Sequence, residues 1–212
     1  MKVVAFNGSP HKEGNTYHAL KMVGEELQNN GIDFEIIQVG NKTIRGCIGC
    51  GGCVKSRDEK CSLHSDEVND WIQVMKEADG IIISSPVHYS GISGTMKSFL
   101  DRAFYVASVN KSMFRHKVGA SVVAVRRSGG SATFDSLNHY INYSEMFMPG
   151  SNYWNIIHGT VPGDVYEDEE GKQIMSVLGK NMAYLLNVLN SSKETVSIHN
   201  PDRKIFTNFV RK

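Results

Sequence analysis

The stretch Met1-Lys2-Val3-Val4-Ala5-Phe6-Asn7-Gly8-Ser9-Pro10 joins a short apolar run to a polar, glycine-containing segment. His-Lys-Glu-Gly-Asn-Thr follows at residues 11–16, and a helical pattern begins there. This order predicts a strand, a polar loop and a helix. Such a loop presents backbone N–H groups and hydroxyls at a helix N-terminus, where the helix dipole favours an anion. Two interpretations stay open: a phosphate site with donors from Ser9, Asn15 and Thr16, or a plain turn in which Asn15 or Thr16 caps the helix.

The rest of the chain repeats this alternation of strand and helix. Strands are expected at residues 1–6, 33–39, 80–84, 116–125 and 151–157, and helices at 16–29, 65–78, 95–107, 132–147 and 169–189. Strict alternation predicts an α/β fold, a parallel sheet with helices on both faces. Five strands in one domain favour the flavodoxin-like three-layer sandwich of order 2-1-3-4-5. The domain is expected over residues 1–189, with an irregular cysteine-rich loop at 44–63 and a C-terminal tail at 190–212.

Composition excludes several classes of function. The 212 residues carry a formal net charge of +1, so neither nucleic acid nor a membrane surface is an expected partner. No apolar run approaches the ~20 residues of a transmembrane helix. The chain begins directly with a strand and shows no leader pattern, which predicts a cytoplasmic protein. The polar tail from Asn190 is expected either to wrap the surface or to meet a partner subunit.

Two further loops follow predicted strands, so they should gather with the first loop at the carboxyl edge of the sheet. The segment Ser85-Pro86-Val87-His88-Tyr89-Ser90-Gly91 follows the third strand, and Arg126-Arg127-Ser128-Gly129-Gly130-Ser131 follows the fourth. Flat side chains and backbone amides here could flank a planar ring, with Pro86 stiffening the chain as it leaves the sheet. Trp154 is expected in the core, with a place at the border of the ring as the alternative. The charges at positions 97, 101 and 102 form either an ordinary helix salt-bridge set or a functional group, and both interpretations stay open.

Together these motifs resemble the NAD(P)H-dependent FMN reductases of the flavodoxin-like superfamily. The likeness covers about residues 1–159 and rests on Gly8-Ser9-Pro10, Gly14-Asn15-Thr16, Ser85-Pro86-Val87-His88-Tyr89 and Met96-Lys97-x-Phe99-x-Asp101-Arg102. It implies FMN, reduced by NAD(P)H or reduced ferredoxin, and a small acceptor such as a quinone, nitroaromatic, azo compound or free flavin. It implies that the phosphate lies on Ser9, Asn15 and Thr16, and the isoalloxazine against Pro86, Val87, His88 and Tyr89.

The resemblance also assigns neighbouring residues. By analogy Arg126, Ser128, Gly129 and Gly130 lie on the other side of the flavin. His11 stands where an arginine often occurs in the family, and a neutral imidazole brings less charge to a phosphate. No general acid is identified, and His88 and Tyr89 are the nearest candidates for a catalytic role.

All four cysteines lie in one short run, at Cys47, Cys50, Cys53 and Cys61. Three thiolates at x₂ spacing can converge on one cluster, because the intervening glycines permit tight turns at positive φ. A self-contained Cys₄ site suits a [4Fe–4S] cluster better than zinc, whose sites usually show two separated C-x₂-C pairs. The alternative is a set of reduced thiols or a redox-active dithiol.

The run also resembles the cysteine motif of the iron-sulfur flavoproteins, a branch of the same superfamily. That likeness implies a [4Fe–4S] cluster on these four cysteines, near FMN and often across a dimer interface, and hence a homodimer or homotetramer. Two rival hypotheses are an electron carrier without substrate turnover, as in flavodoxin, and a zinc-stapled binding module on an α/β scaffold.

Overall fold

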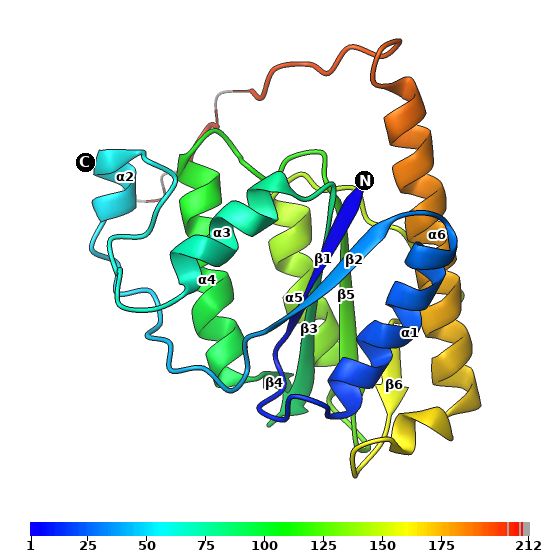
Figure 1. Ribbon diagram of the computed structural model, residues 1–212. Helices are drawn as coiled ribbons and strands as arrows, with labels where there is room; N and C mark the ends of the chain where they lie inside the picture. The colour runs from blue at the N-terminus through cyan, green and yellow to red at the C-terminus, as the bar shows by residue number, and fades with distance from the viewer. Residues whose placement is uncertain (203, 208, 210–212) are drawn as a thin grey trace.

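A computed structural model describes residues 1–202, 204–207 and 209 (Figure 1). Its elements in chain order are β1 (Lys2–Asn7), α1 (Asn15–Asn29), β2 (Asp33–Gln38), α2 (Gly52–Ser56), α3 (Val68–Glu77), β3 (Gly80–His88), β4 (Gly91–Ile92), α4 (Gly94–Val109), β5 (Val118–Val125), α5 (Gly130–Tyr143), β6 (Ile156–His158), the 3₁₀ turn η1 (Asp164–Tyr166) and α6 (Glu169–Ser192).

Five strands form a parallel sheet in the order β2-β1-β3-β5-β6. Counted without β4, this is the predicted order 2-1-3-4-5. β1 lies between β2 and β3 in the sheet. Val3 of β1 lies opposite Phe34 of β2 on one side and opposite Gly80 of β3 on the other. β1, β3 and β5 are almost wholly buried, as their near-continuous apolar sequences require. The predicted flavodoxin-like fold class is confirmed.

Helices cover both faces of this sheet (Figure 1). Helices α1 and α6 bury one face with Leu20, Val23 and Met182 among their core residues, and α3, α4 and α5 bury the other with Trp71 and Phe99. None of the helices in the described part of the chain is both long and apolar enough to cross a membrane.

The structure differs from the sequence prediction at several element boundaries. β3 continues past residue 84 as far as His88, because its two buried serines find partners: Ser84 donates its hydroxyl to the Phe6 carbonyl and Ser85 to the Pro86 carbonyl. α5 ends at Tyr143 instead of residue 147, where Glu145 adopts a positive φ of 55°. The last strand covers only residues 156–158 of the expected region.

Residues 151–155, expected in that strand, form a hydrogen-bonded turn instead. The Ser151 hydroxyl donates to Asn155 Oδ1, and the buried Asn155 amide donates to the Ser121 carbonyl. Within the irregular segment at 44–63 a short helix, α2, was not predicted. α6 also extends three residues beyond the expected residue 189.

The tail leaves α6 after Ser192 and crosses the end of the molecule toward α4 (Figure 1). Its described residues form neither helix nor strand. Arg115 donates to the His199 carbonyl over 3.0 Å, and Lys204 Nζ lies 3.7 Å from the centre of the Tyr143 ring. The tail thus lies against the ends of α4 and α5, and its place at a subunit interface stays a prediction.

Candidate functional site

The loop between β1 and α1 forms a tight cradle at the carboxyl edge of the sheet. A Cβ added to Gly8 would lie 2.4 Å from the Ser84 carbonyl oxygen, and one added to Gly14 would lie 3.1 Å from Ser9 Oγ. Ser9 is 4% exposed, and its Oγ accepts a hydrogen bond from the His11 N–H over 3.1 Å. The backbone therefore closes round the mouth of α1 with the Ser9 hydroxyl on its inner side.

α1 begins without a side-chain cap. Its N-cap is Gly14, and no side chain accepts a hydrogen bond from the first turn. The interpretation of Asn15 or Thr16 as caps is therefore wrong. Asn15 Oδ1 instead accepts a hydrogen bond from the Gly163 N–H over 2.9 Å and so ties α1 to the segment after β6. The first-turn N–H groups, which have no partner within a helix, are left available to an anion.

Thr16 gives the clearest indication of a ligand site in this loop. Its side chain is 1% exposed, and its Oγ1 has no hydrogen-bond partner among the described residues. A buried hydroxyl without a partner costs about 1–3 kcal/mol, so such groups are rare unless a ligand satisfies them. The hydroxyl lies in the first turn of α1, where a phosphate oxygen would accept its proton. These residues fit the phosphate of FMN.

The second predicted loop is a β-hairpin. β3 and β4 pair antiparallel, with Val87 opposite Ile92 and His88 opposite Gly91. Tyr89 and Ser90, the two turn residues, have φ of 49° and 58°, the signature of a type I′ turn. Pro86 therefore lies inside the strand, which corrects the expectation that the chain leaves the sheet there. The Tyr89 side chain is fully exposed at the tip, and His88 is exposed beside it.

The third loop packs directly against this hairpin. Gly129, with φ of 85°, is the N-cap of α5, and a Cβ there would lie 2.8 Å from the Ser90 Cα. Gly130 is buried against Ile156, whereas Arg126 and Ser128 are exposed. The predicted residues of these two loops are thus brought together at one edge. How Arg126 and Ser128 lie relative to a flavin stays a prediction.

Sequence reasoning missed the serine that joins the first two loops. Ser93, at the N-cap of α4, donates its hydroxyl to the Gly8 carbonyl over 2.7 Å, and its N–H donates to Ser85 Oγ over 2.9 Å. It is 3% exposed. A serine directly before a helical pattern was a usable signal for an N-cap, but its bond to a loop 85 residues away was not visible in the sequence.

A hollow of about 360 Å³ lies beside the third loop. Arg127, Tyr153, Trp154 and His158 are among the residues that line it. Trp154 is 52% exposed, so the expectation of a core residue is wrong. The two aromatic rings lie with their centres 4.4 Å apart and their planes inclined at 58°, and they offer an apolar surface next to the glycine loop.

The four cysteines line one small cavity between their own loop and α4, together with Arg102 and Tyr105. Gly49 and Gly51 have φ of 64° and 67°, as the tight turns of this run require. Cys53 and Cys61 are buried, and Cys47 and Cys50 are exposed. The cavity measures about 20 Å³, room for about one water molecule. Among residues 1–202, 204–207 and 209, no three His, Cys, Asp or Glu side chains are arranged to hold a metal ion.

The surroundings of the thiols shift the pKa values of Cys50 and Cys53 in opposite directions. The hydrogen bond from the Gly52 N–H, and then the hydrogen bond between the thiol and the Ser62 hydroxyl, lower the pKa of the Cys50 thiol. Burial, followed by the charge of the nearby Cys61, raises the pKa of the Cys53 thiol. The raised pKa favours the protonated Cys53 thiol. A cationic centre bound at Cys53 would favour the thiolate instead, because metal ligation deprotonates a thiol. Four thiols with N–H and O–H donors around them are a donor set suited to an iron-sulfur cluster.

The cysteine site is displaced from the flavin edge. α4 starts at that edge with Gly94 and runs back along the sheet, and Arg102, which touches the cysteine loop, lies eight residues further on. At 1.5 Å per residue this is about 12 Å along the helix. Figure 1 shows the loop after β2 running along α4, with α2 beyond it and away from β4. The implied position of a cluster near FMN, often across a dimer interface, stays a prediction.

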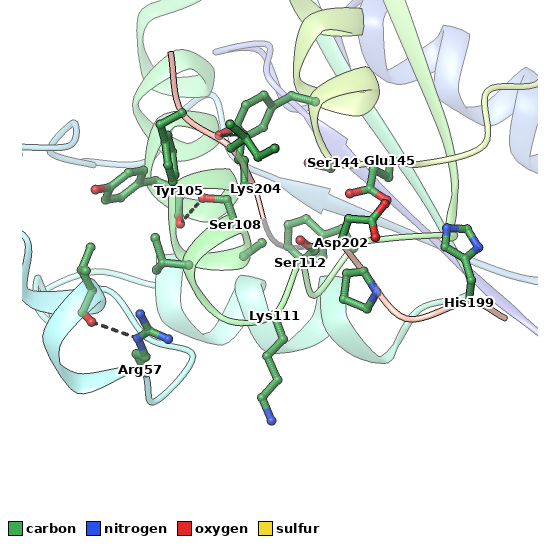
Figure 2. A pocket seen from close by; sticks show the side chains of 18 residues that line it. Arg57, Tyr105, Ser108, Lys111, Ser112, Ser144, Glu145, His199, Asp202 and Lys204 are labelled. Atoms are coloured by element: carbon green, nitrogen blue, oxygen red, sulfur yellow. Dashed lines mark hydrogen bonds between the residues drawn. The ribbon is translucent and has the colours of Figure 1, made fainter. Parts of the chain in front are cut away.

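A further cavity, about 1010 Å³, lies at the opposite, amino-terminal edge of the sheet. Figure 2 shows it between the ends of α4 and α5 and the tail, with Tyr105, Lys111, Glu145 and Lys204 among its labelled side chains. None of the predicted flavin-binding residues lines it. It is separate from the site at the carboxyl edge.

Comparison with known proteins agrees with this geometry. The family model for NADPH-dependent FMN reductase matches residues 1–161. An iron-sulfur flavoprotein of Methanocaldococcus jannaschii is 32% identical over 89% of this chain and 99% of its own. An NADPH azoreductase of Bacillus sp. is 25% identical over 93% and 99%. The solved structure of RosB with bound 8-demethyl-8-formylriboflavin-5′-phosphate has a TM-score of 0.67 at 14% identity, covering 100% of this chain and 94% of its own.

Proposed function

Because this chain belongs to the NADPH-dependent FMN reductase family of flavoprotein oxidoreductases, we propose that it holds FMN in the three loops at its carboxyl edge. The orphaned Thr16 hydroxyl carries this proposal, together with the uncapped first turn of α1 and the adjacent Ser9. These groups would bind the phosphate. The β3–β4 hairpin and the Gly129 loop, which touch each other, would bind the isoalloxazine.

Flavin supplies the electron transfer, and the residues supply binding and orientation. NAD(P)H is the proposed donor, with reduced ferredoxin as the alternative, and the acceptor is a quinone-like compound, a flavin or another small molecule. The relatives named as iron-sulfur flavoprotein and as NADPH azoreductase support an enzyme over an electron carrier or a zinc-stapled module. His88 and Tyr89 remain the proposed proton-donor candidates, since both are exposed at the hairpin.

The test of the flavin site is the change Thr16→Val. It removes the orphaned hydroxyl and keeps the shape of the side chain. A hydrogen bond to a charged group contributes about 1.5–3 kcal/mol, so FMN should bind about 10- to 100-fold more weakly, as measured by quenching of flavin fluorescence. Ser121→Ala is the matched control, because that buried hydroxyl already donates to Asn138 Oδ1 inside the fold. Unchanged FMN affinity in the Thr16 variant would count against the site.

The four cysteines are proposed as the ligands of a [4Fe–4S] cluster. The support is their common cavity, the glycines at positive φ and the relatives named as iron-sulfur flavoproteins. Because the cavity is small, the run must open to admit the cluster. Anaerobic purification with iron and sulfide analysis tests the proposal, and Cys50→Ala should remove iron and leave FMN bound. If the purified wild-type protein contained flavin but no iron, the proposal of a cluster would be refuted and the proposal of an FMN reductase would stand.

A homodimer or homotetramer is proposed as the working form. The cysteine site lies about 12 Å along α4 from the flavin edge of its own chain, so a second subunit could bring its flavin closer. The tail also carries exposed apolar side chains, of which Ile205 is 94% and Phe209 92% exposed. Light scattering of the full chain and of a chain ending at Ser192 tests this. The full chain should be oligomeric, and the shorter one should dissociate at lower concentration.

A further inference from the structure

Arg102 is the largest side chain that the fold buries completely. It lies in the middle of α4, and its side chain is 0% exposed. Removing a guanidinium from water is costly, so a buried arginine is retained only where its charge and its donors are matched. Of the two interpretations left open by the sequence, the helix salt-bridge set holds for Lys97 and Asp101, whereas Arg102 pairs with Asp66 outside the helix.

All five N–H donors of Arg102 have acceptors, three in the cysteine-rich segment and two in the carboxylate of Asp66 just beyond it. Nε donates to Cys61 Sγ over 3.3 Å. One terminal nitrogen donates to the Arg45 carbonyl and to Asp66 Oδ2, at 3.1 and 2.5 Å, and the other to the Leu63 carbonyl and Asp66 Oδ1, at 2.8 and 3.0 Å. One side chain therefore fixes both ends of the cysteine run against α4.

The charges within this group are already balanced. Asp66 is 5% exposed and binds the guanidinium with both carboxylate oxygens, the strongest geometry for such a pair. Cys61 is therefore not needed as the counter-ion of Arg102. The Nε–H group that points at the Cys61 sulfur is an additional donor. The other four hydrogen bonds of the guanidinium and the packing around this buried side chain hold it in place.

We propose that Arg102 is the positioning residue of the cysteine site, which orients Cys61 as a ligand and raises the reduction potential of the cluster held there. The inference rests on the proposed cluster. Reduction by the proposed electron donor would add one electron to a cluster bound there and would make its thiolate shell more negative. An N–H donor to a ligand sulfur and a nearby positive charge favour that form. Asp66 acts in the opposite direction, because its charge opposes the added electron.

Three variants test this, each compared with the reconstituted wild-type protein for iron per chain, bound FMN and midpoint potential. Arg102→Gln should bind less iron, and its remaining cluster should have a more negative potential. Arg102→Lys keeps the positive charge and loses the planar set of guanidinium N–H donors, so the midpoint potential of its cluster should fall less than in Arg102→Gln. Asp66→Asn leaves the N–H···S bond and removes a negative charge, so its potential should rise. Bound FMN reports that each variant is folded.

Lys97→Gln is the matched control on the same helix, because Lys97 pairs with Asp101 on the surface. It should leave iron content and potential unchanged. A shift in this control as large as that of Arg102→Gln would overturn the inference, since charge anywhere on α4 would then suffice. Iron content and potential unchanged in Arg102→Gln would also overturn it.

The positioning role can also be tested in the apoprotein, which allows a test even of variants that retain no iron. Iodoacetamide labelling of the anaerobic apoprotein, mapped by peptide mass spectrometry, should modify the buried Cys61 several-fold faster in both Arg102 variants. The exposed Cys50 should react as in the wild type. Equal labelling of Cys61 would overturn the positioning role. A wild-type protein that takes up no iron would instead refute the proposed cluster, a failure that is distinguishable from that of Arg102 alone.

Discussion

The hydroxyl of Ser93 donates a hydrogen bond to the carbonyl of Gly8 over 2.7 Å and thereby joins the start of α4 to the loop after β1. The Gly8 N–H in turn donates to the Ser84 carbonyl, so the loop is held from two neighbouring elements. The proposed phosphate cradle is therefore held in place by Ser84 and Ser93, which are not among the residues proposed to bind the phosphate.

Ser93→Ala should destabilise the fold by about 1 kcal/mol and weaken FMN binding several-fold, because the cradle loses one of its supports. Urea unfolding of the apoprotein and FMN titration measure the two effects. Ser136→Ala is the control, since its exposed hydroxyl bonds only within its own helix, to the Ala132 carbonyl. Normal FMN affinity in the Ser93 variant would show that the bond supports stability alone.

Gly129→Ala should destabilise the protein and disturb the flavin site. Two causes act there: a φ of 85°, and a Cβ only 2.8 Å from the Ser90 backbone. Gly31 isolates the first cause, because its φ is 73° and a Cβ there would meet nothing within 4 Å. We expect Gly31→Ala to cost about 1 kcal/mol and Gly129→Ala about 1–3 kcal/mol more, measured by urea unfolding. Equal costs would argue against contact between the two loops.

Tyr140 makes stability depend on pH in the alkaline range. Burial and the hydrogen bond from its hydroxyl to Asp101, at 2.5 Å, raise the pKa of Tyr140 to about 12. Because the folded protein favours the protonated phenol, this contribution is complete below about pH 10 and is lost as the pH rises toward about 12. The free energy of unfolding should therefore fall more between about pH 10 and about pH 12 in the wild type than in Tyr140→Phe. Parallel profiles would contradict this assignment.

Removal of iron should leave the flavin in place. The proposed cluster ligands and the proposed phosphate cradle share no residue, and about 12 Å of α4 separates Arg102 from the flavin edge. Treatment of the anaerobic holoprotein with an iron chelator should therefore abolish the cluster absorption and keep FMN bound, as judged by gel filtration and flavin absorbance. Release of FMN together with iron would show that the two sites depend on each other.

The sequence was sufficient for the sheet because each buried strand is a short apolar run between polar loops. It was also sufficient for the positions of the three loops, since the carboxyl ends of parallel strands share one edge. The sequence did not predict β4, because two residues are too few to show the alternation of apolar and polar side chains that indicates a strand. It failed for Arg102 as well, because its counter-ion Asp66 lies 36 residues earlier and only the folded chain brings the two together.

The chain connects the cysteine-rich segment to the sheet through β2 at one end and to α3 at the other, and Arg102 and Asn110 are buried side chains that hold it. Such an attachment makes the segment a module. A lineage could lengthen it, shorten it or lose its cysteines without altering the cradle around Thr16. One scaffold can in this way give rise to reductases with and without a second redox centre, and exchange of this single loop between relatives is a practical route for engineering either kind.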